Sequence, residues 1–303
     1  GISGLSKDDI IAPGDLAKES FGYDSRKKKS FDIVFIDESH KLKQRVNLGT
    51  QYGNYDKINS KLGLPKDATQ MDWIIDQVRL PVFFYDPLQA IGPSCLSEEN
   101  ISQTLGCSVK TPIVLDSQMR VKGGKNYLEY IANILSDKNP KFEIFSGYDL
   151  FLHQTFSTFV ESFEKDYEKH NLSRIIAGYA WPWVSKGEPR ADIFDIKYEG
   201  KGLRWNCTYE NWVGRGFNNS SIAHEVGCIH SIQGYDLSYA YVIIGGDLEI
   251  DDETGLLRAN KNNYYDKNGK NTVSQDELTQ YIKNIYYVLL TRGIFGTHIY
   301  VAD

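Results

Sequence analysis

Short apolar runs separated by polar stretches dominate the hydrophobic pattern of this chain. The clearest run, residues 31–36 with the sequence FDIVFI, leads directly into Asp37 and Glu38. An apolar run of this length is typical of a strand buried on both faces of a parallel sheet. Ligands gather beyond the carboxyl ends of such strands. The pattern predicts a strand that delivers two carboxylates to a ligand crevice, although a buried strand that ends in a solvated acidic turn fits the same residues.

The same pattern predicts further strands and helices. Apolar positions at helical spacing predict several helices. Helices and buried strands in one chain indicate an α/β fold. Residues 247–277 show no apolar period and are expected to form a long surface insertion. Strands are expected over 80–86, 113–115, 174–179, 226–229, 240–244 and 297–301, a hairpin over 193–198 and 203–207, and helices over 67–79, 127–135, 155–170 and 278–291.

The second predicted strand also ends in a carboxylate. Residues 80–86 close on Asp86, which is followed by Pro87 and Gln89. Proline fixes a turn, and a glutamine there can reach a γ-phosphate or the water that attacks it. A strand end in which Asp37 holds Mg²⁺ and Glu38 polarises a water is typical of the Walker-B strand of a nucleotide hydrolase. Two such strand ends in succession favour this interpretation.

Composition and charge limit the alternatives. The chain has 303 residues, enough for one large or two ordinary domains, with 41% hydrophobic and 24% charged residues. No apolar run approaches the roughly 20 residues of a membrane span, and no signal-peptide core begins the chain. The four cysteines show no CxxC spacing, so a disulfide framework or zinc site is not expected and a reduced, cytoplasmic setting is.

Two features bear on nucleic-acid binding. The net charge of −6 provides no overall basic field, which counts mildly against such binding but leaves room for a local basic groove. The basic run at residues 26–29 suits a solvated loop better than a phosphate contact. Four of the five tryptophans lie between residues 181 and 212, where they could stack on bases, although packing roles are more common.

No phosphate-binding loop of the form G-x-x-x-x-G-K-[ST] occurs in the chain. The segment 122–125 imitates it but has neither the first glycine nor the hydroxyl after the lysine. A Walker-B strand without this loop implies a degenerate ATPase or a chain cut after its phosphate-binding loop. The missing initiator methionine favours the cut.

Five stretches of the chain follow one another in a set order: FDIVFIDESHKL at 31–42, FFYDPLQAI at 83–91, LDSQMR at 115–120, EVGCIHSIQGYDLSYAYVIIGGDL at 225–248 and NIYYVLLTRGIFGTHIYVAD at 284–303. In this order they resemble motifs II, III, IV, V and VI of a superfamily-1 helicase or translocase core, and most closely those of the Schlafen group 3-like DNA/RNA helicase domain family. The resemblance runs from about residue 30 to the end of the chain.

The resemblance implies an α/β chain of two RecA-like lobes with mainly parallel sheets, of the P-loop NTPase type. The first, incomplete lobe would span residues 1–114 and the second residues 115–303. ATP and Mg²⁺ would lie between the lobes, and single-stranded DNA or RNA would cross both. A fused or partner domain is expected upstream of residue 1.

It also implies roles for residues of the first lobe. Asp37 would hold Mg²⁺, Glu38 would activate the attacking water, and Gln89 would sense the γ-phosphate. Tyr85 stands where many superfamily-1 members have glycine, so the geometry of this loop is not given by the resemblance.

In the second lobe, Arg120 and Arg292 would stabilise charge on the transferred phosphoryl group. Arg292 also suits a simpler role at the end of a helix, where a cation stabilises the helix dipole. Gln233 and Gly234 would couple the phosphate state to the grip on nucleic acid, and Asp236 would face the ribose. Two other functions fit the same motifs: a nucleotide-dependent switch without translocation, and a pseudo-ATPase scaffold.

Overall fold

The structure is a computed structural model that describes residues 10–18, 31–105, 113–115, 119–187, 192–206, 212–214 and 225–302. Its contacts divide the chain into two compact units, residues 1–113 (unit 1) and residues 114–303 (unit 2). The basic run at residues 26–29 and residues 116–118 of the predicted motif at 115–120 lie outside the described residues. Within the described part of the chain, no helix is long and apolar enough to cross a bilayer.

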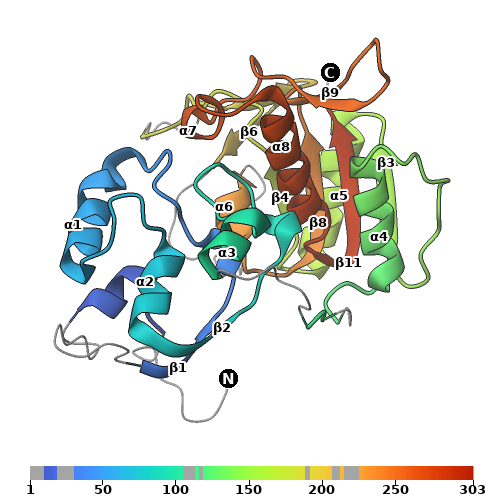
Figure 1. The fold of residues 1–303 in the computed structure, drawn as a ribbon. Helices are drawn as coiled ribbons and strands as arrows, with labels where there is room; N and C mark the ends of the chain where they lie inside the picture. Colours follow the sequence, from blue (N-terminus) through green and yellow to red (C-terminus); the bar gives the residue numbers. More distant parts are fainter. Residues whose placement is uncertain are drawn as a thin grey trace. The chain divides into compact units, whose positions relative to one another are not determined.

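Unit 1 is built around two parallel strands, β1 (Phe31–Ile36) and β2 (Val78–Phe83), in which Ile33 pairs with Leu80. Helix α2 (Gln70–Gln77) runs directly into β2 and begins at a capping box formed by Thr69 and Asp72. Helix α1 (Tyr52–Leu62) ends at Gly63, and α3 (Glu98–Leu105) is the last helix of the unit among the described residues (Figure 1). The strand predicted at 80–86 therefore exists but lies a few residues earlier.

One apolar face of the β1–β2 pair is exposed. The side chains of Ile33, Phe35 and Leu80 are 56%, 69% and 56% exposed. By contrast, Ile36 packs in the core of the unit with Met71 and other apolar residues from α2 and its neighbours. The prediction that both faces of β1 are buried is therefore wrong, because the described elements of unit 1 cover only one side of the pair.

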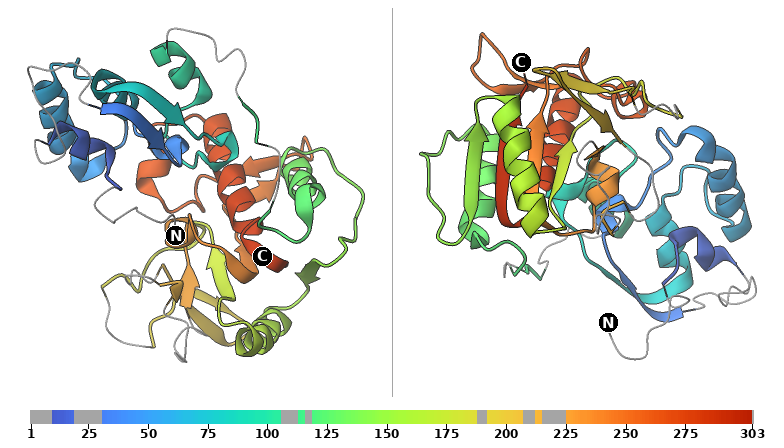
Figure 2. Two further views of the ribbon diagram at one scale, coloured as in Figure 1. Left: turned by 90° about the horizontal axis from the view of Figure 1, so that it is seen from below. Right: turned by 180° about the vertical axis from the view of Figure 1, so that it is seen from behind.

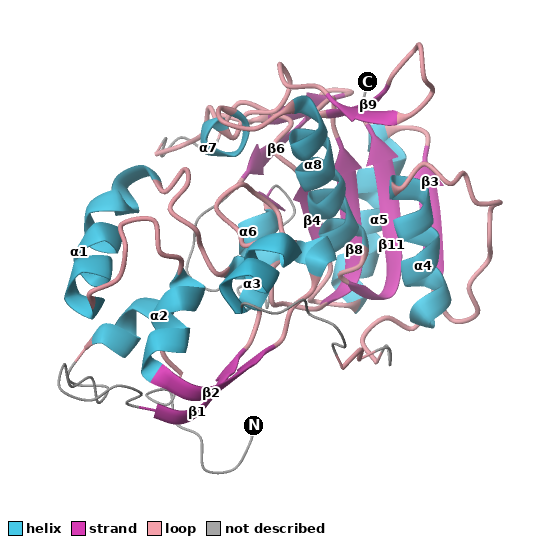
Figure 3. Ribbon diagram, viewed as in Figure 1, coloured by secondary structure: helices cyan, strands magenta, loops and turns pink. Residues whose placement is uncertain are grey.

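Unit 2 contains a seven-stranded sheet with the order β3-β11-β8-β4-β7-β6-β5. All neighbouring strands in it are parallel except β5 and β6, which form an antiparallel hairpin (Figure 3). The predicted α/β class with a mainly parallel sheet is confirmed, and the arrangement is consistent with a RecA-like fold. The strands are β3 (Asp149–His153), β4 (Arg174–Ala177), β5 (Ile196–Tyr198), β6 (Lys201–Trp205), β7 (Glu225–Gly227), β8 (Leu237–Ile244) and β11 (Gly293–Val301).

Helices cover both faces of this sheet. Helices α4 (Gly124–Leu135) and α8 (Gln275–Leu290) lie on one face, and α5 (Phe156–Lys169) lies on the other (Figures 1 and 2). Each helix has the apolar face that the sequence predicts; in α5 this face consists of Phe156, Phe159 and neighbouring residues. Because both faces are covered, all four residues of β4 are buried.

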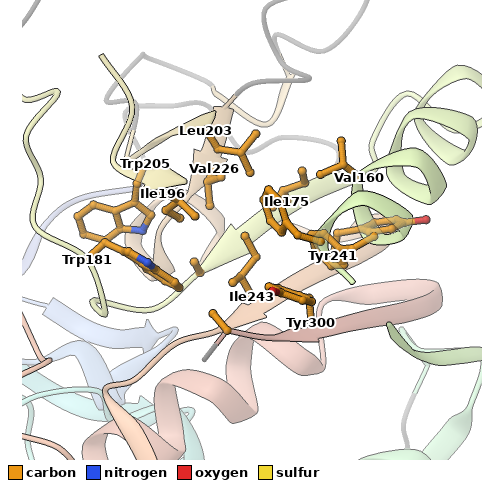
Figure 4. Packing of buried hydrophobic residues seen from close by; sticks show 14 of the residues in the cluster. Val160, Ile175, Trp181, Ile196, Leu203, Trp205, Val226, Tyr241, Ile243 and Tyr300 are labelled. Carbon is orange, nitrogen blue, oxygen red and sulfur yellow. The ribbon is translucent and has the colours of Figure 1, made fainter. Parts of the chain in front are cut away.

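The core between α5 and the sheet combines aliphatic side chains from the strands with aromatic rings (Figure 4). Three of the clustered tryptophans are buried packing residues, namely Trp181, Trp205 and Trp212. Trp183 is partly buried against Trp205, and the Lys186 ammonium lies 5.0 Å from the centre of its ring. Packing, rather than base stacking, accounts for most of this aromatic segment.

The strands near residues 174–179, 226–229, 240–244 and 297–301, the hairpin, and the helices near 127–135, 155–170 and 278–291 are confirmed, with shifts of a few residues at their ends. The strand predicted at 113–115 is wrong. The three apolar side chains of this segment are at least 72% exposed, and its backbone pairs with no strand among the described residues. Helix α1 and edge strand β3 were not predicted, since neither shows a clean apolar period.

The insertion at 247–277 is more structured than its composition predicts. It forms the hairpin β9 (Leu248–Ile250) and β10 (Leu257–Ala259) and the short helix α7 (Lys267–Lys270). Tyr264 is 1% exposed, and the backbone N–H of Tyr265 donates to the carbonyl of Tyr179 at 2.8 Å. Single aromatic residues anchor the segment to the rest of the unit. A search for periodic apolar positions does not detect isolated residues of this kind.

Candidate functional site

Two carboxylates follow β1 directly, as the sequence predicts. Asp37 is exposed, and its Oδ1 accepts a hydrogen bond from the backbone N–H of Glu38 at 2.9 Å. Glu38 itself adopts the left-handed conformation, with φ 51° and ψ 41°. Non-glycine residues in this region are uncommon and cost free energy, which makes them frequent at functional turns.

The Glu38 carboxylate lies between two nitrogen groups of the same turn. Its Oε2 is 3.0 Å from His40 Nε2 and 3.1 Å from Lys41 Nζ. The contact with His40, assisted by Lys41 and opposed by partial burial, lowers the pKa of Glu38 to about 2. The His40 side chain is 2% exposed and meets the Tyr85 ring edge-on. Neither contact has the geometry of a hydrogen bond. The low pKa nevertheless means that Glu38 is ionised at neutral pH.

A second polar loop follows β2. Asp86 caps the short turn Pro87–Gln89, with its Oδ1 accepting from the backbone N–H of Leu88 at 3.0 Å. Its other oxygen accepts from Gln89 Nε2 at 2.7 Å. The amide of Gln89 is thus oriented by the carboxylate that ends the strand segment.

Hydrogen bonds join these two loops at the same end of the parallel pair. The backbone N–H and the hydroxyl of Ser39 both donate to the carbonyl of Phe84, at 2.9 and 2.6 Å. The N–H of Phe84 donates to the carbonyl of Ile36 at 2.9 Å. Unit 1 therefore brings the Asp37–Glu38 turn and the Asp86–Gln89 turn to one edge of its sheet.

Unit 2 assembles residues from three predicted motifs. Arg120 Nε lies 2.5 Å from Asp236 Oδ1. Backbone hydrogen bonds fix the neighbouring residues, because Leu237 N–H donates to the carbonyl of Arg292 at 3.0 Å and Lys122 N–H donates to the carbonyl of Ile294 at 2.9 Å. Asp236 directly precedes β8 and Arg292 directly precedes β11, whereas the carboxylates of unit 1 follow their strands.

Arg292 is 2% exposed in the structure. Its Nε donates to the carbonyl of Val288 at 3.3 Å, in the last turn of α8. This contact fits the simpler role, in which a cation stabilises the carboxyl end of a helix. Its role as a phosphoryl-stabilising arginine stays a prediction.

Gln233 and Gly234 form the turn between the short helix α6 (Ile229–Ile232) and β8. Gly234 has φ +96°, which only glycine adopts readily. Gln233 Nε2 is buried and forms no hydrogen bond with the described residues. The coupling role of this turn stays a prediction.

Sequence reasoning missed two residues that organise the site, His40 and Lys41, and it identified Asp86 as a strand-end carboxylate without its contact with Gln89. The signals were present, since a histidine and a lysine follow the paired carboxylates within three residues, and an aspartate directly precedes a proline turn. Both patterns place a polar side chain within reach of its own turn.

Comparison with known proteins shows similarity to a family of helicase domains and to a yeast protein. The family described as "Schlafen group 3, DNA/RNA helicase domain" matches residues 9–303. The uncharacterized protein YPL245W of Saccharomyces cerevisiae is 22% identical over 329 aligned residues, which cover 99% of this chain and 68% of the yeast protein.

Proposed function

Because this chain belongs to the Schlafen group 3 DNA/RNA helicase domain family, we propose that it is the motor part of an ATP-dependent helicase or translocase of superfamily 1. Such a protein couples ATP hydrolysis to movement on, or remodelling of, single-stranded DNA or RNA. The observation that supports this proposal best is the turn after β1, where Asp37 is open to solvent and Glu38 is held ionised by His40 and Lys41.

Glu38 suits the orientation of an attacking water. A carboxylate with a pKa of about 2 remains negatively charged at neutral pH, so it can accept a hydrogen bond from water and polarise it. Its left-handed backbone and the two nearby nitrogen groups restrict where the carboxylate can lie. Pre-organisation of this kind lowers a barrier without further rearrangement.

Asp37 would suit the Mg²⁺ of a Mg²⁺–ATP complex, whereas the sequence contains no phosphate-binding loop for the nucleotide. No group of three or more acidic, histidine or cysteine side chains that could hold a metal occurs in the described part of the chain. Mg²⁺ is commonly bound by one or two carboxylates together with substrate phosphates, so the exposed Asp37 suits it. When bound, the ion would neutralise phosphate charge.

The remaining roles divide between the two units. Gln89, oriented by Asp86, would contact the γ-phosphate, and Arg120 and Arg292 would stabilise charge that builds on it. Gln233 and Gly234 would pass the phosphate state to the grip on nucleic acid. A nucleotide that binds one arrangement of the units better than another shifts their equilibrium by that difference in affinity, which is the source of movement.

The experiment is to measure ATP hydrolysis by the full-length protein with and without single-stranded DNA and RNA oligonucleotides. Stimulation by either strand is expected, and Asp37→Asn should weaken Mg²⁺-dependent ATP binding by about tenfold or more, because it removes the charge facing the ion. The matched control is Asp67→Asn, an exposed aspartate of the same unit.

Two outcomes would replace the proposal. ATP binding and turnover without any response to single strands would indicate a nucleotide-dependent switch. No binding of ATP to the full-length protein would indicate a scaffold that kept the fold and lost the chemistry.

A further inference from the structure

The ion pair between Arg120 and Asp236 joins two residues that resemblance alone assigned to different tasks. Arg120 was expected on the transferred phosphoryl group and Asp236 on the ribose. In the structure the two side chains lie 2.5 Å apart, through Arg120 Nε and Asp236 Oδ1. One oxygen of the Asp236 carboxylate therefore faces Arg120.

The backbone around the pair is fixed on both sides. The residue after Asp236 donates its N–H to the carbonyl of Arg292, and Lys122, two residues after Arg120, donates to the carbonyl of Ile294. Both acceptors lie at the start of β11 or directly before it. The backbone on both sides of the ion pair is therefore fixed by its hydrogen bonds to the sheet.

The nitrogen used in the contact suits orientation. A guanidinium has five N–H donors in one plane, one on Nε and four on the terminal nitrogens. An acceptor at Nε lies against one side edge of the group and fixes its plane, so the end edge, where each terminal nitrogen directs one N–H, points away from Asp236. Those terminal nitrogens are the donors that bind a phosphate in the bidentate manner.

We infer that Asp236 is a positioning residue for Arg120: it orients the guanidinium toward the phosphates and does not bind the ribose. This inference rests on the proposed function, since it names the phosphates of a nucleotide as the target of Arg120. The pair is exposed, at 41% and 44% of the two side chains. Exposed ion pairs contribute little to stability, so a substitution at Asp236 is expected to leave the protein folded.

The kinetic test compares Asp236→Ala, Asp236→Asn and Arg120→Ala in the full-length protein, with ATP and 2′-deoxyATP as substrates. Asp236→Ala should lower kcat by about 10–100-fold with KM changed by less than about threefold, because orientation acts on the transition state. Asp236→Asn, which keeps an acceptor oxygen, should recover part of the rate. In the Arg120→Ala background, Asp236→Ala should cause no further loss.

The preference for ATP over 2′-deoxyATP decides between the two roles. It should be unchanged in Asp236→Ala if Asp236 serves Arg120. A loss of this preference in Asp236→Ala, present also in the Arg120→Ala background, would overturn the inference and restore the ribose role. An unchanged kcat in Asp236→Ala would overturn it as well. The matched control is Asp252→Asn, at an exposed position on the insertion.

A second measurement does not depend on hydrolysis. The Nε–H resonance of Arg120 in a ¹H–¹⁵N spectrum, identified by its loss in Arg120→Lys, should exchange slowly with water in the wild type. It should shift and exchange faster in Asp236→Ala but not in Asp252→Asn. A resonance that does not respond to Asp236→Ala overturns the inference. A protein that never hydrolyses ATP contradicts the proposed function, and this spectrum still decides whether Asp236 holds Arg120.

Discussion

Strands β1 and β4 have nearly the same apolar character but opposite surroundings. In β1, Ile33 is 56% exposed and Phe35 is 69% exposed. In β4, Ile175 and Ile176 are fully buried between helices on both faces of the sheet. An apolar run therefore determines that a strand forms, whereas its burial depends on the neighbours that the rest of the fold provides.

The carboxylates that follow strands in the two units also differ in their surroundings and in their pKa values. Glu38, after β1, is half-buried beside His40 and Lys41, and these contacts lower its pKa to about 2. Asp247, after β8, is fully buried, and burial raises its pKa to about 7 despite a hydrogen bond from the Tyr286 hydroxyl at 2.6 Å. The first carboxylate is ionised in a partly exposed turn, and the second belongs to the core.

The largest expected effect is on ATP turnover, through the role proposed for Arg292 of unit 2. Arg292→Ala should lower ATP turnover of the full-length protein by about 10³-fold or more, if the side chain stabilises charge in the transition state. Steady-state hydrolysis measures it, with Arg258→Ala on the exposed insertion as the control. A variant that folds normally and retains near-normal turnover would restrict Arg292 to its contact with α8.

The contrast in burial predicts unequal costs for the same substitution. Ile176→Ala should reduce the free energy of unfolding by about 2–5 kcal/mol, because it opens a cavity in a packed core. Ile33→Ala should cost less than about 1 kcal/mol, since its side chain is largely in solvent. Denaturant unfolding, with hydrogen exchange followed separately in each unit, measures both. Equal costs would mean that the exposed face of β1 is covered in solution.

The buried carboxylate predicts a pH dependence of stability. Because the pKa of Asp247 is raised in the folded state, to about 7 from about 3.9 when unfolded, folding binds a proton between these values and stability falls as pH rises from about 4 to 7. Asp247→Asn should remove this loss, on the order of 2–4 kcal/mol above pH 7.

The measurement compares the unfolding free energies of Asp247→Asn and the wild type at each pH. This comparison is needed because His298, whose pKa is lowered to about 4 by burial and by His153, makes stability fall in the opposite direction, as pH drops below about 6.5. A difference between variant and wild type that does not grow from pH 4 to pH 7 would contradict the raised pKa.

The smallest effect is the loss of stability when a helix cap is removed, and it should be the same in both units. Both contain a helix that begins at a capping box, Thr69 with Asp72 in unit 1 and Ser274 with Glu277 in unit 2. Thr69→Ala and Ser274→Ala should each cost about 1 kcal/mol of stability, measured by thermal or denaturant unfolding. A much smaller cost in unit 1 would indicate that α2 is held by packing rather than by its cap.

Much of the fold could be predicted because its signals are local. The apolar face of α8 and the buried run of β8 each lie in one stretch of sequence, and both were found. Strand β3 was missed because its side chains at Asp149, Phe151 and Leu152 are exposed at the sheet edge and follow no period. Burial was predicted wrongly for β1 because it depends on distant parts of the chain.

The candidate site divides in the same way. The positions of Asp37, Glu38 and Gln89 follow from their place after predicted strands, and the structure groups them at one sheet edge. The contact between Arg120 and Asp236 joins residues more than one hundred positions apart, so no spacing in the sequence indicates it. The assignment of residues 1–114 and 115–303 to two RecA-like lobes stays a prediction.

The most direct test of the central claim is to measure ATP binding and turnover together in the Glu38→Gln variant of the full-length protein. The substitution keeps the shape of the side chain but removes the charge that His40 and Lys41 stabilise. Turnover should fall by about 10²–10⁴-fold while the Kd for ATP changes by less than about threefold. Glu143→Gln, on an exposed segment of unit 2, should leave both unchanged. Near-normal turnover in Glu38→Gln would contradict the account.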